Sequence, residues 1–115
     1  MNDSDAAAAL SDALERACLF APFLAAQTRR FPDLVEQLRA GDLSGALRRC
    51  PEGLEHQPPA RRLRLERSRF ALVLGIGDLG GLLSLGAVTT ALSDLADRAL
   101  DRAIAAAIAE RAPGA

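Results

Sequence analysis

The sequence predicts an all-α protein, a helical bundle in which short N-terminal helices pack on two longer C-terminal helices. Half of the 115 residues are hydrophobic, and Leu and Ala, which both favour helices, supply most of that apolar mass. β-branched residues are sparse and scattered, so no segment has the composition of a strand. Prolines and glycines divide the chain into segments of helical length. A chain of this size forms one domain.

The first predicted helix runs from Asp5 to about Phe20, with Ser4 or Asp5 as its N-cap. Apolar side chains follow helical spacing along it, and the charged residues lie off that line. The two cysteines, Cys18 and Cys50, are far apart in the sequence of a helical chain. We expect buried thiols rather than a disulfide.

Two prolines begin the next two helices. Pro22 interrupts the first helix and starts a second one that reaches Arg30, because proline is tolerated at a first helical position. Pro32 starts a third helix, which extends to Ala40 and ends at Gly41 in the left-handed conformation. Residues 42–45 are then predicted as a turn, and 46–50 as at most a short helical piece.

Residues 51–59, PEGLEHQPP, contain three prolines, one glycine and little to bury, so they are the best candidate for a linker. The chain is accordingly divided into residues 1–58, with the short helices and the linker, and residues 59–115, with two longer helices. We expect the two parts to form one compact unit.

Five arginines crowd the start of the fourth predicted helix, where the helix dipole favours anions. They form either a solvated face, whose charges pair with acids elsewhere, or a docking patch for an acidic surface. Nucleic acid is excluded as a partner, because no aromatic residues interleave them. The residues of this possible docking patch are Arg61, Arg62, Arg64, Arg67 and Arg69.

Residues 70–76 are apolar on every side, which predicts burial all round. Gly75 and Gly77 suit the close approach of another helix. Asp78 is assigned a structural role, in which it caps backbone N–H groups or pairs with an arginine. Ser84 is the predicted N-cap of the last helix, which extends from residue 85 to about residue 111. These two long helices are expected to leave an exposed apolar face that promotes self-association or docking.

Composition excludes several functions. The net charge of −1 provides no field that attracts nucleic acid or an anionic membrane, and a charged Asp78 argues against a membrane span. The N-terminus is acidic where a secretion signal is basic, which favours the cytoplasm. We find no metal-ligand set, phosphate loop or nucleophile with a base. A small enzyme that uses the Asp97 and Asp101 carboxylates is the weakest alternative.

Residues 66–100 resemble the segment before the first nucleotidyltransferase domain of bacterial bifunctional glutamine synthetase adenylyltransferase/adenylyl-removing enzymes. An arginine-rich helix start and an apolar run precede the motif. The chain departs from the family pattern in two ways: it has glycines at Gly75 and Gly77, and it lacks acids at Gly86 and Ala87. The matching residues are Asp78-Leu79-Gly80-Gly81, Leu85, Val88-Thr89, Leu92-Ser93 and Leu95-Ala96-Asp97, with weaker similarity at Pro22-Phe23-Leu24 and Phe31 to Leu34.

The resemblance implies a parent enzyme that uses ATP and Mg²⁺ to transfer AMP to a tyrosine of glutamine synthetase and removes it by phosphorolysis, under control of the PII protein. The family's Gly-Ser and Asp-x-Asp motifs lie beyond the position equivalent to Ala115. This chain therefore receives no catalytic, cofactor-binding or metal residue from the family. It is expected to be a non-catalytic helical fragment whose partner is the missing catalytic domain, or a stand-alone helical interaction module.

Overall fold

The structure, a computed structural model, describes residues 3–83, 90, 93–94 and 96–98. Contacts divide the chain into two units, residues 1–84 and 85–115. Helices are the only regular elements among the described residues, which confirms the all-α prediction. Five labelled helices belong to the first unit: α1 (Asp3–Phe20), α2 (Pro22–Arg30), α3 (Pro32–Arg39), α4 (Leu43–Arg49) and α5 (Pro59–Leu79).

Helix α1 begins earlier than predicted. It starts at Asp3, so Ser4 and Asp5 lie within its first turn and neither is the N-cap. Acidic side chains in a first turn interact favourably with the helix dipole, and the alanines that follow propagate the helix. The predicted apolar face is confirmed, because Leu10, Leu14 and Ala17 are all buried.

Helices α2 and α3 confirm the roles predicted for the prolines. Pro22 and Pro32 each occupy a first helical position. Phe31 lies between the two helices and is both the C-cap of α2 and the N-cap of α3. Gly41 follows α3 with a φ of 84°, a conformation that glycine adopts at no steric cost.

Helix α4 is longer than predicted. It begins at Leu43, inside the segment predicted to be a turn, and ends at Arg49. The carboxylate of Asp42 accepts a hydrogen bond from the backbone N–H of Gly45 at 2.9 Å, so Asp42 is a true N-cap. The sequence reasoning missed this cap because Gly45 resembles a turn residue.

Helix α5 carries the centre of the core. The predicted apolar run is largely buried, including Phe70, Leu72, Val73 and Ile76. A Cβ atom at Gly75 would lie 2.9 Å from Leu24 Cδ2, so the missing side chain allows α2 to approach α5. Gly80 caps the end of the helix.

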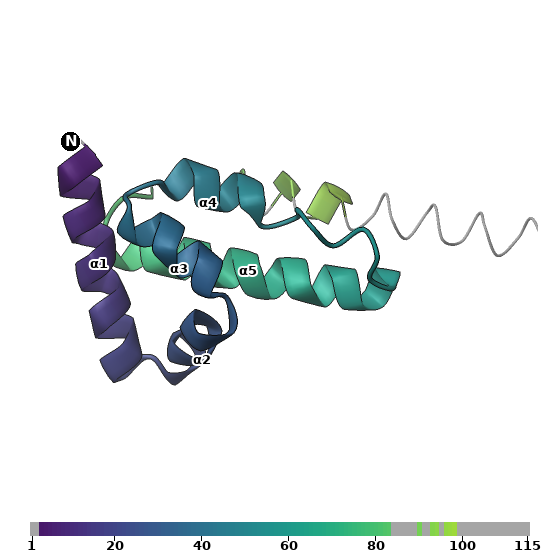
Figure 1. Cartoon of the computed structure of the whole chain (residues 1–115), viewed down its shortest axis with the longest axis horizontal. Helices are drawn as coiled ribbons and strands as arrows, with labels where there is room; N and C mark the ends of the chain where they lie inside the picture. Colours follow the sequence, from purple (N-terminus) through teal and green to yellow (C-terminus); the bar gives the residue numbers. More distant parts are fainter. Residues whose placement is uncertain (1–2, 84–89, 91–92, 95, 99–115) are drawn as a thin grey trace, which may run out of the picture. The chain divides into compact units, whose positions relative to one another are not determined.

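The helices of the first unit pack around α5 (Figure 1). Helices α3 and α4 run beside α5, and α1 crosses its C-terminal end. The Arg16 guanidinium donates a hydrogen bond from Nη2 to the carbonyl oxygen of Leu79 at 2.7 Å, and it pairs with Asp12 at 2.9 Å. Arg16 thereby satisfies a carbonyl that the end of α5 leaves open.

The proline-rich segment after α4 is bound through its backbone to α5. It consists of tight turns, and Leu54 within it is 3% exposed. Arg62 Nε donates to the Leu54 carbonyl at 3.0 Å, and Arg62 Nη2 donates to the carbonyls of Glu55 and Gln57. Most of its residues are exposed, in agreement with the prediction that it has little to bury, but an arginine of α5 binds its backbone.

Exposed apolar side chains lie at the corner between α1 and α2, away from the buried run of α5. The exposed fractions are 74% for Leu19, 80% for Phe20 and 59% for Phe23. The prediction of an exposed face on the long helices is therefore wrong for residues 70–76, and we name Leu19, Phe20 and Phe23 the apolar corner. Cys18, beside this corner, is exposed rather than buried, whereas Cys50 is buried; neither forms a disulfide.

Within the described residues, no helix is both long enough and apolar enough to cross a membrane. The last predicted helix lies mainly outside the described residues, as do Ser84 and Asp101. Of that helix, residues 90, 93–94 and 96–98 are described, and they are helical.

Candidate functional site

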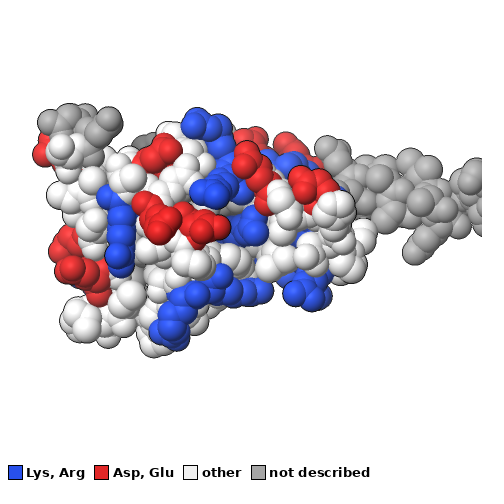
Figure 2. Space-filling view, in the orientation of Figure 1, with Lys and Arg blue, Asp and Glu red and all other residues white. Residues whose placement is uncertain are grey.

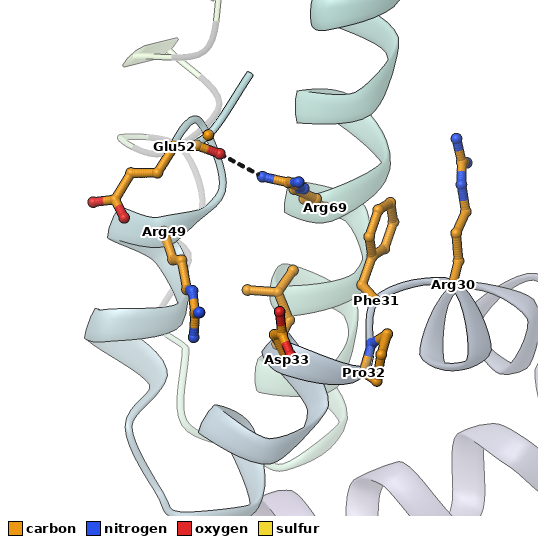
Figure 3. A pocket seen from close by; sticks show the side chains of 9 residues that line it. Arg30, Phe31, Pro32, Asp33, Arg49, Glu52 and Arg69 are labelled. Carbon is orange, nitrogen blue, oxygen red and sulfur yellow. Dashed lines mark hydrogen bonds between the residues drawn. The ribbon is translucent and has the colours of Figure 1, made fainter. Parts of the chain in front are cut away.

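A pocket of about 450 Å³ opens where the α2–α3 junction faces the turn after α4 and the middle of α5 (Figure 3). Its lining combines apolar groups with three arginines from three different helices. Its two carboxylates come from the start of α3 and from the turn after α4. The lining residues are Arg30, Phe31, Pro32, Asp33, Leu34, Arg49, Glu52, Gly53 and Arg69.

Arg69 is held in place on two sides. Its Nη1 donates hydrogen bonds to the carbonyl oxygens of Glu52 at 2.8 Å and Cys50 at 3.2 Å. Its guanidinium carbon lies 5.6 Å from the centroid of the Phe31 ring, within the range of a cation–π interaction. Since one edge of the guanidinium is bound to the backbone, its position in the pocket is fixed before any ligand arrives.

The Phe31 ring also contacts Arg30, whose guanidinium carbon lies 5.2 Å from the ring centroid. Arg30 Nη1 lies 3.4 Å from the hydroxyl of Ser68 on α5 and donates a hydrogen bond to it. Figure 3 shows the ring between the two arginines. The apolar wall of the pocket is therefore flanked by positive charge.

Arg49, in the last turn of α4, supplies the third positive charge. Its Nη1 donates to Gln37 Oε1 at 3.3 Å, and the side chain is exposed. Gln37 in turn donates from Nε2 to Asp42 Oδ2 at 3.0 Å. Together with the Gly45 N–H, this hydrogen bond lowers the pKa of the Asp42 carboxyl, the Gln37 contact being the larger cause.

The structure divides the predicted docking patch into two sets of arginines. Arg62 and Arg69 bind backbone carbonyls of the turn segment, as described above. Arg61, Arg64 and Arg67 are exposed on α5. The α3–α4 face in Figure 2 shows acidic and basic side chains interleaved rather than a field of one sign.

The two residues predicted to have structural roles are only partly described. Asp78 lies in the last turn of α5 with its side chain exposed, and its backbone carbonyl accepts a hydrogen bond from the N–H of Gly81 at 3.0 Å. Among the described residues, we find no hydrogen bond or ion pair to its carboxylate. At this end of α5, the hydrogen bond from another helix is the one that Arg16 donates to the Leu79 carbonyl. Ser84 lies outside the described residues.

No group of three or more His, Cys, Asp or Glu side chains within the described ranges is arranged to hold a metal ion. The pocket's chemistry is therefore that of its guanidinium groups, its aromatic ring and the start of α3. Guanidinium groups bind carboxylates and phosphates through paired hydrogen bonds. The arrangement is suited to binding an anionic group.

Sequence reasoning included Arg69 in its patch but missed Arg30, Phe31 and Arg49. The available signal was local: a proline break with an arginine and an aromatic residue directly before it. Nothing in the sequence spacing placed Arg49 or Arg69 beside that break, because they belong to other helices. Their convergence depends on how α4 and α5 pack against α3.

Comparison with known proteins shows a match over a short segment of the chain. The chain is 51% identical over 45 residues to the bifunctional glutamine synthetase adenylyltransferase/adenylyl-removing enzyme of Xanthobacter autotrophicus (strain ATCC BAA-1158 / Py2). The match covers 39% of this chain and 5% of that enzyme. No protein-family model and no solved structure matches the chain. The identity supports a relation to this enzyme over a short segment.

Proposed function

We propose that this chain is a non-catalytic helical element of a glutamine synthetase adenylyltransferase, which acts as a structural and docking part beside the catalytic portion. The 51% identity to the Xanthobacter enzyme carries the proposal. The parent activity is transfer of AMP from ATP to a tyrosine of glutamine synthetase and its removal by phosphorolysis. The parent's cofactors are ATP and Mg²⁺, and its further partners are glutamine synthetase and the PII protein in the cytoplasm.

The apolar corner supports a docking role. Three large apolar side chains lie together in sequence at the α1–α2 junction, each more than half exposed. Burying one such side chain contributes about 1.5–3 kcal/mol. A second protein surface that covers the corner would be stabilised by that burial.

The proposal predicts that the chain alone transfers no AMP. Incubated with ATP, Mg²⁺ and glutamine synthetase, it leaves the synthetase unmodified, and mass spectrometry of the synthetase checks this. The full-length Xanthobacter enzyme is the positive control. AMP incorporation by the chain alone would refute the non-catalytic assignment.

A second measurement tests docking. The chain is titrated into the Xanthobacter enzyme from which the matching segment has been deleted, and binding is followed by calorimetry. Saturable binding supports the proposal. Absence of binding favours the alternative, a stand-alone helical interaction module without enzyme activity.

A further inference from the structure

We propose that the arginine pocket beside Phe31 binds an acidic peptide segment and holds one of its carboxylates between Arg49 and Arg69. This inference deepens the proposed docking function and rests on it, since it names the chemistry of a partner. The occupant is a peptide in which carboxylate and apolar side chains alternate.

The charges of the lining favour an anion. Three guanidinium groups face two carboxylates, which leaves one positive charge in excess. Figure 3 shows the carboxylate of Glu52 turned away from Arg69, while its backbone carbonyl accepts the hydrogen bond from Arg69. The side chain of Glu52 therefore does not neutralise that guanidinium.

Arg69 is already oriented in the free chain. Arg69 is bound to two carbonyls through Nη1 and packs over the Phe31 ring, so its remaining N–H groups are presented without further ordering. Immobilising a long side chain on binding costs about 0.5–1.5 kcal/mol of conformational free energy. Because Arg69 is already immobilised in the folded chain, binding loses little of this entropy there. Arg49 supplies the second, more adaptable guanidinium.

The start of α3 adds to the attraction. Phe31 is its N-cap and offers no side-chain oxygen to the first N–H groups of the helix. Unsatisfied N–H groups at a helix start favour negative charge. Asp33, which is exposed in the first turn, supplies part of this negative charge.

The wall of the pocket distinguishes a peptide from a free anion. Phe31 and Pro32 give it an apolar side next to the guanidinium groups. A free phosphate ion would gain nothing from that side, whereas an apolar side chain next to an acidic one would cover it. An alternation of Glu and Leu in the peptide satisfies both surfaces.

The test uses the full chain and a fluorescein-labelled hexapeptide of alternating Glu and Leu, because the chain contains no Trp or Tyr whose fluorescence could report binding. Fluorescence anisotropy measures the affinity. Arg49→Gln should weaken binding about tenfold, through loss of one charge-assisted contact. Arg48→Gln, an exposed neighbour outside the pocket, is the matched control and should leave the affinity unchanged.

NMR of the arginine Nε–Hε signals gives the location. Shifts centred on Arg49 and Arg69, together with a Gln-for-Glu peptide that does not bind, support the proposal. Shifts centred on the exposed Arg61, Arg64 and Arg67 overturn it, as does inorganic phosphate binding as tightly as the peptide. These outcomes are separate from docking to the truncated enzyme, so failure of the pocket and failure of the proposed function are distinguishable.

Discussion

At the scale of single residues, Asp42 shows how one carboxylate organises its surroundings. It caps α4 through the Gly45 N–H and accepts a hydrogen bond from Gln37. Both contacts are stronger to the ionised form, which is why the pKa of Asp42 is lowered. Its stabilising effect is therefore complete at neutral pH.

The lowered pKa of Asp42 has a predicted dependence on pH. The unfolded carboxyl titrates near 3.8, and the folded one below that value. The contribution to stability is therefore present above pH 3.8 and is lost as the pH falls through the folded pKa. Urea melts of the natural chain and of Asp42→Asn should differ most near pH 6 and converge as the pH falls below 3.8. A difference that stays constant down to the lowest pH at which the chain folds would contradict this role.

Residue-scale chemistry was only partly predictable from the sequence. The proline positions and the αL glycine at Gly41 follow from local backbone rules, and the structure confirms them. The pocket could not be predicted from these rules, because Phe31 and Arg69 are far apart in the sequence and no local rule predicts their contact. For the same reason the sequence could not distinguish Arg62 and Arg69, which bind carbonyls, from their exposed neighbours.

At the scale of helices, the contact between α2 and α5 depends on a missing side chain. A Cβ at Gly75 would lie 2.9 Å from Leu24 Cδ2 and 3.2 Å from Cδ1. Ala gains about 1 kcal/mol of helix propensity over Gly, and the tip of the half-buried Leu24 has room to shift. Gly75→Ala should therefore be close to neutral in a chemical melt.

A larger side chain at Gly75 changes that balance. Gly75→Val should cost about 1–3 kcal/mol, because an overpacked contact forces the helices apart. Gly81→Ala is the control for backbone conformation, since a Cβ there meets nothing within 4 Å but φ is 72°; its cost should be about 1–2 kcal/mol. Equal tolerance of Ala and Val at Gly75 would mean that the α2–α5 distance is not set there.

Helix boundaries were predictable where proline or glycine marks them. The α4 start was not, because a side-chain cap at Asp42 overrode a turn-like sequence. The burial of residues 70–76 follows from their composition alone and is confirmed. The hydrogen bonds that α5 donates to the turn segment could not be predicted, because composition does not show which helix a segment contacts.

At the scale of the whole first unit, the apolar corner predicts self-association. Soluble monomers seldom leave an apolar patch larger than about 300–600 Å² uncovered. Sedimentation at rising concentration should show a growing fraction of dimers. The double change Phe20→Ser and Phe23→Ser should abolish it, because both side chains are exposed and contribute little to the fold.

Leu79→Ser is the matched control for this prediction. Leu79 is also an exposed apolar side chain, at 38%, but it lies at the end of α5 and its carbonyl still accepts Arg16. The Leu79→Ser variant should therefore self-associate as the natural chain does. If the natural chain stays monomeric throughout the concentration range, the apolar corner does not mediate self-association.

The two arginines that bind the turn segment also bear on how this unit opens. Within the tight turns, the Glu52 N–H donates to the Arg49 carbonyl and the Gln57 N–H donates to the Leu54 carbonyl. Without further support from α5, such isolated hydrogen bonds would open readily. Carbonyl groups of these turns accept hydrogen bonds from the guanidinium groups of Arg62, in the first turn of α5, and Arg69, at its middle. Unfolding of the first half of α5 would therefore release the segment. In hydrogen exchange, the amides of Glu52 and Gln57 would then open together with the first half of α5, as one cooperative unit.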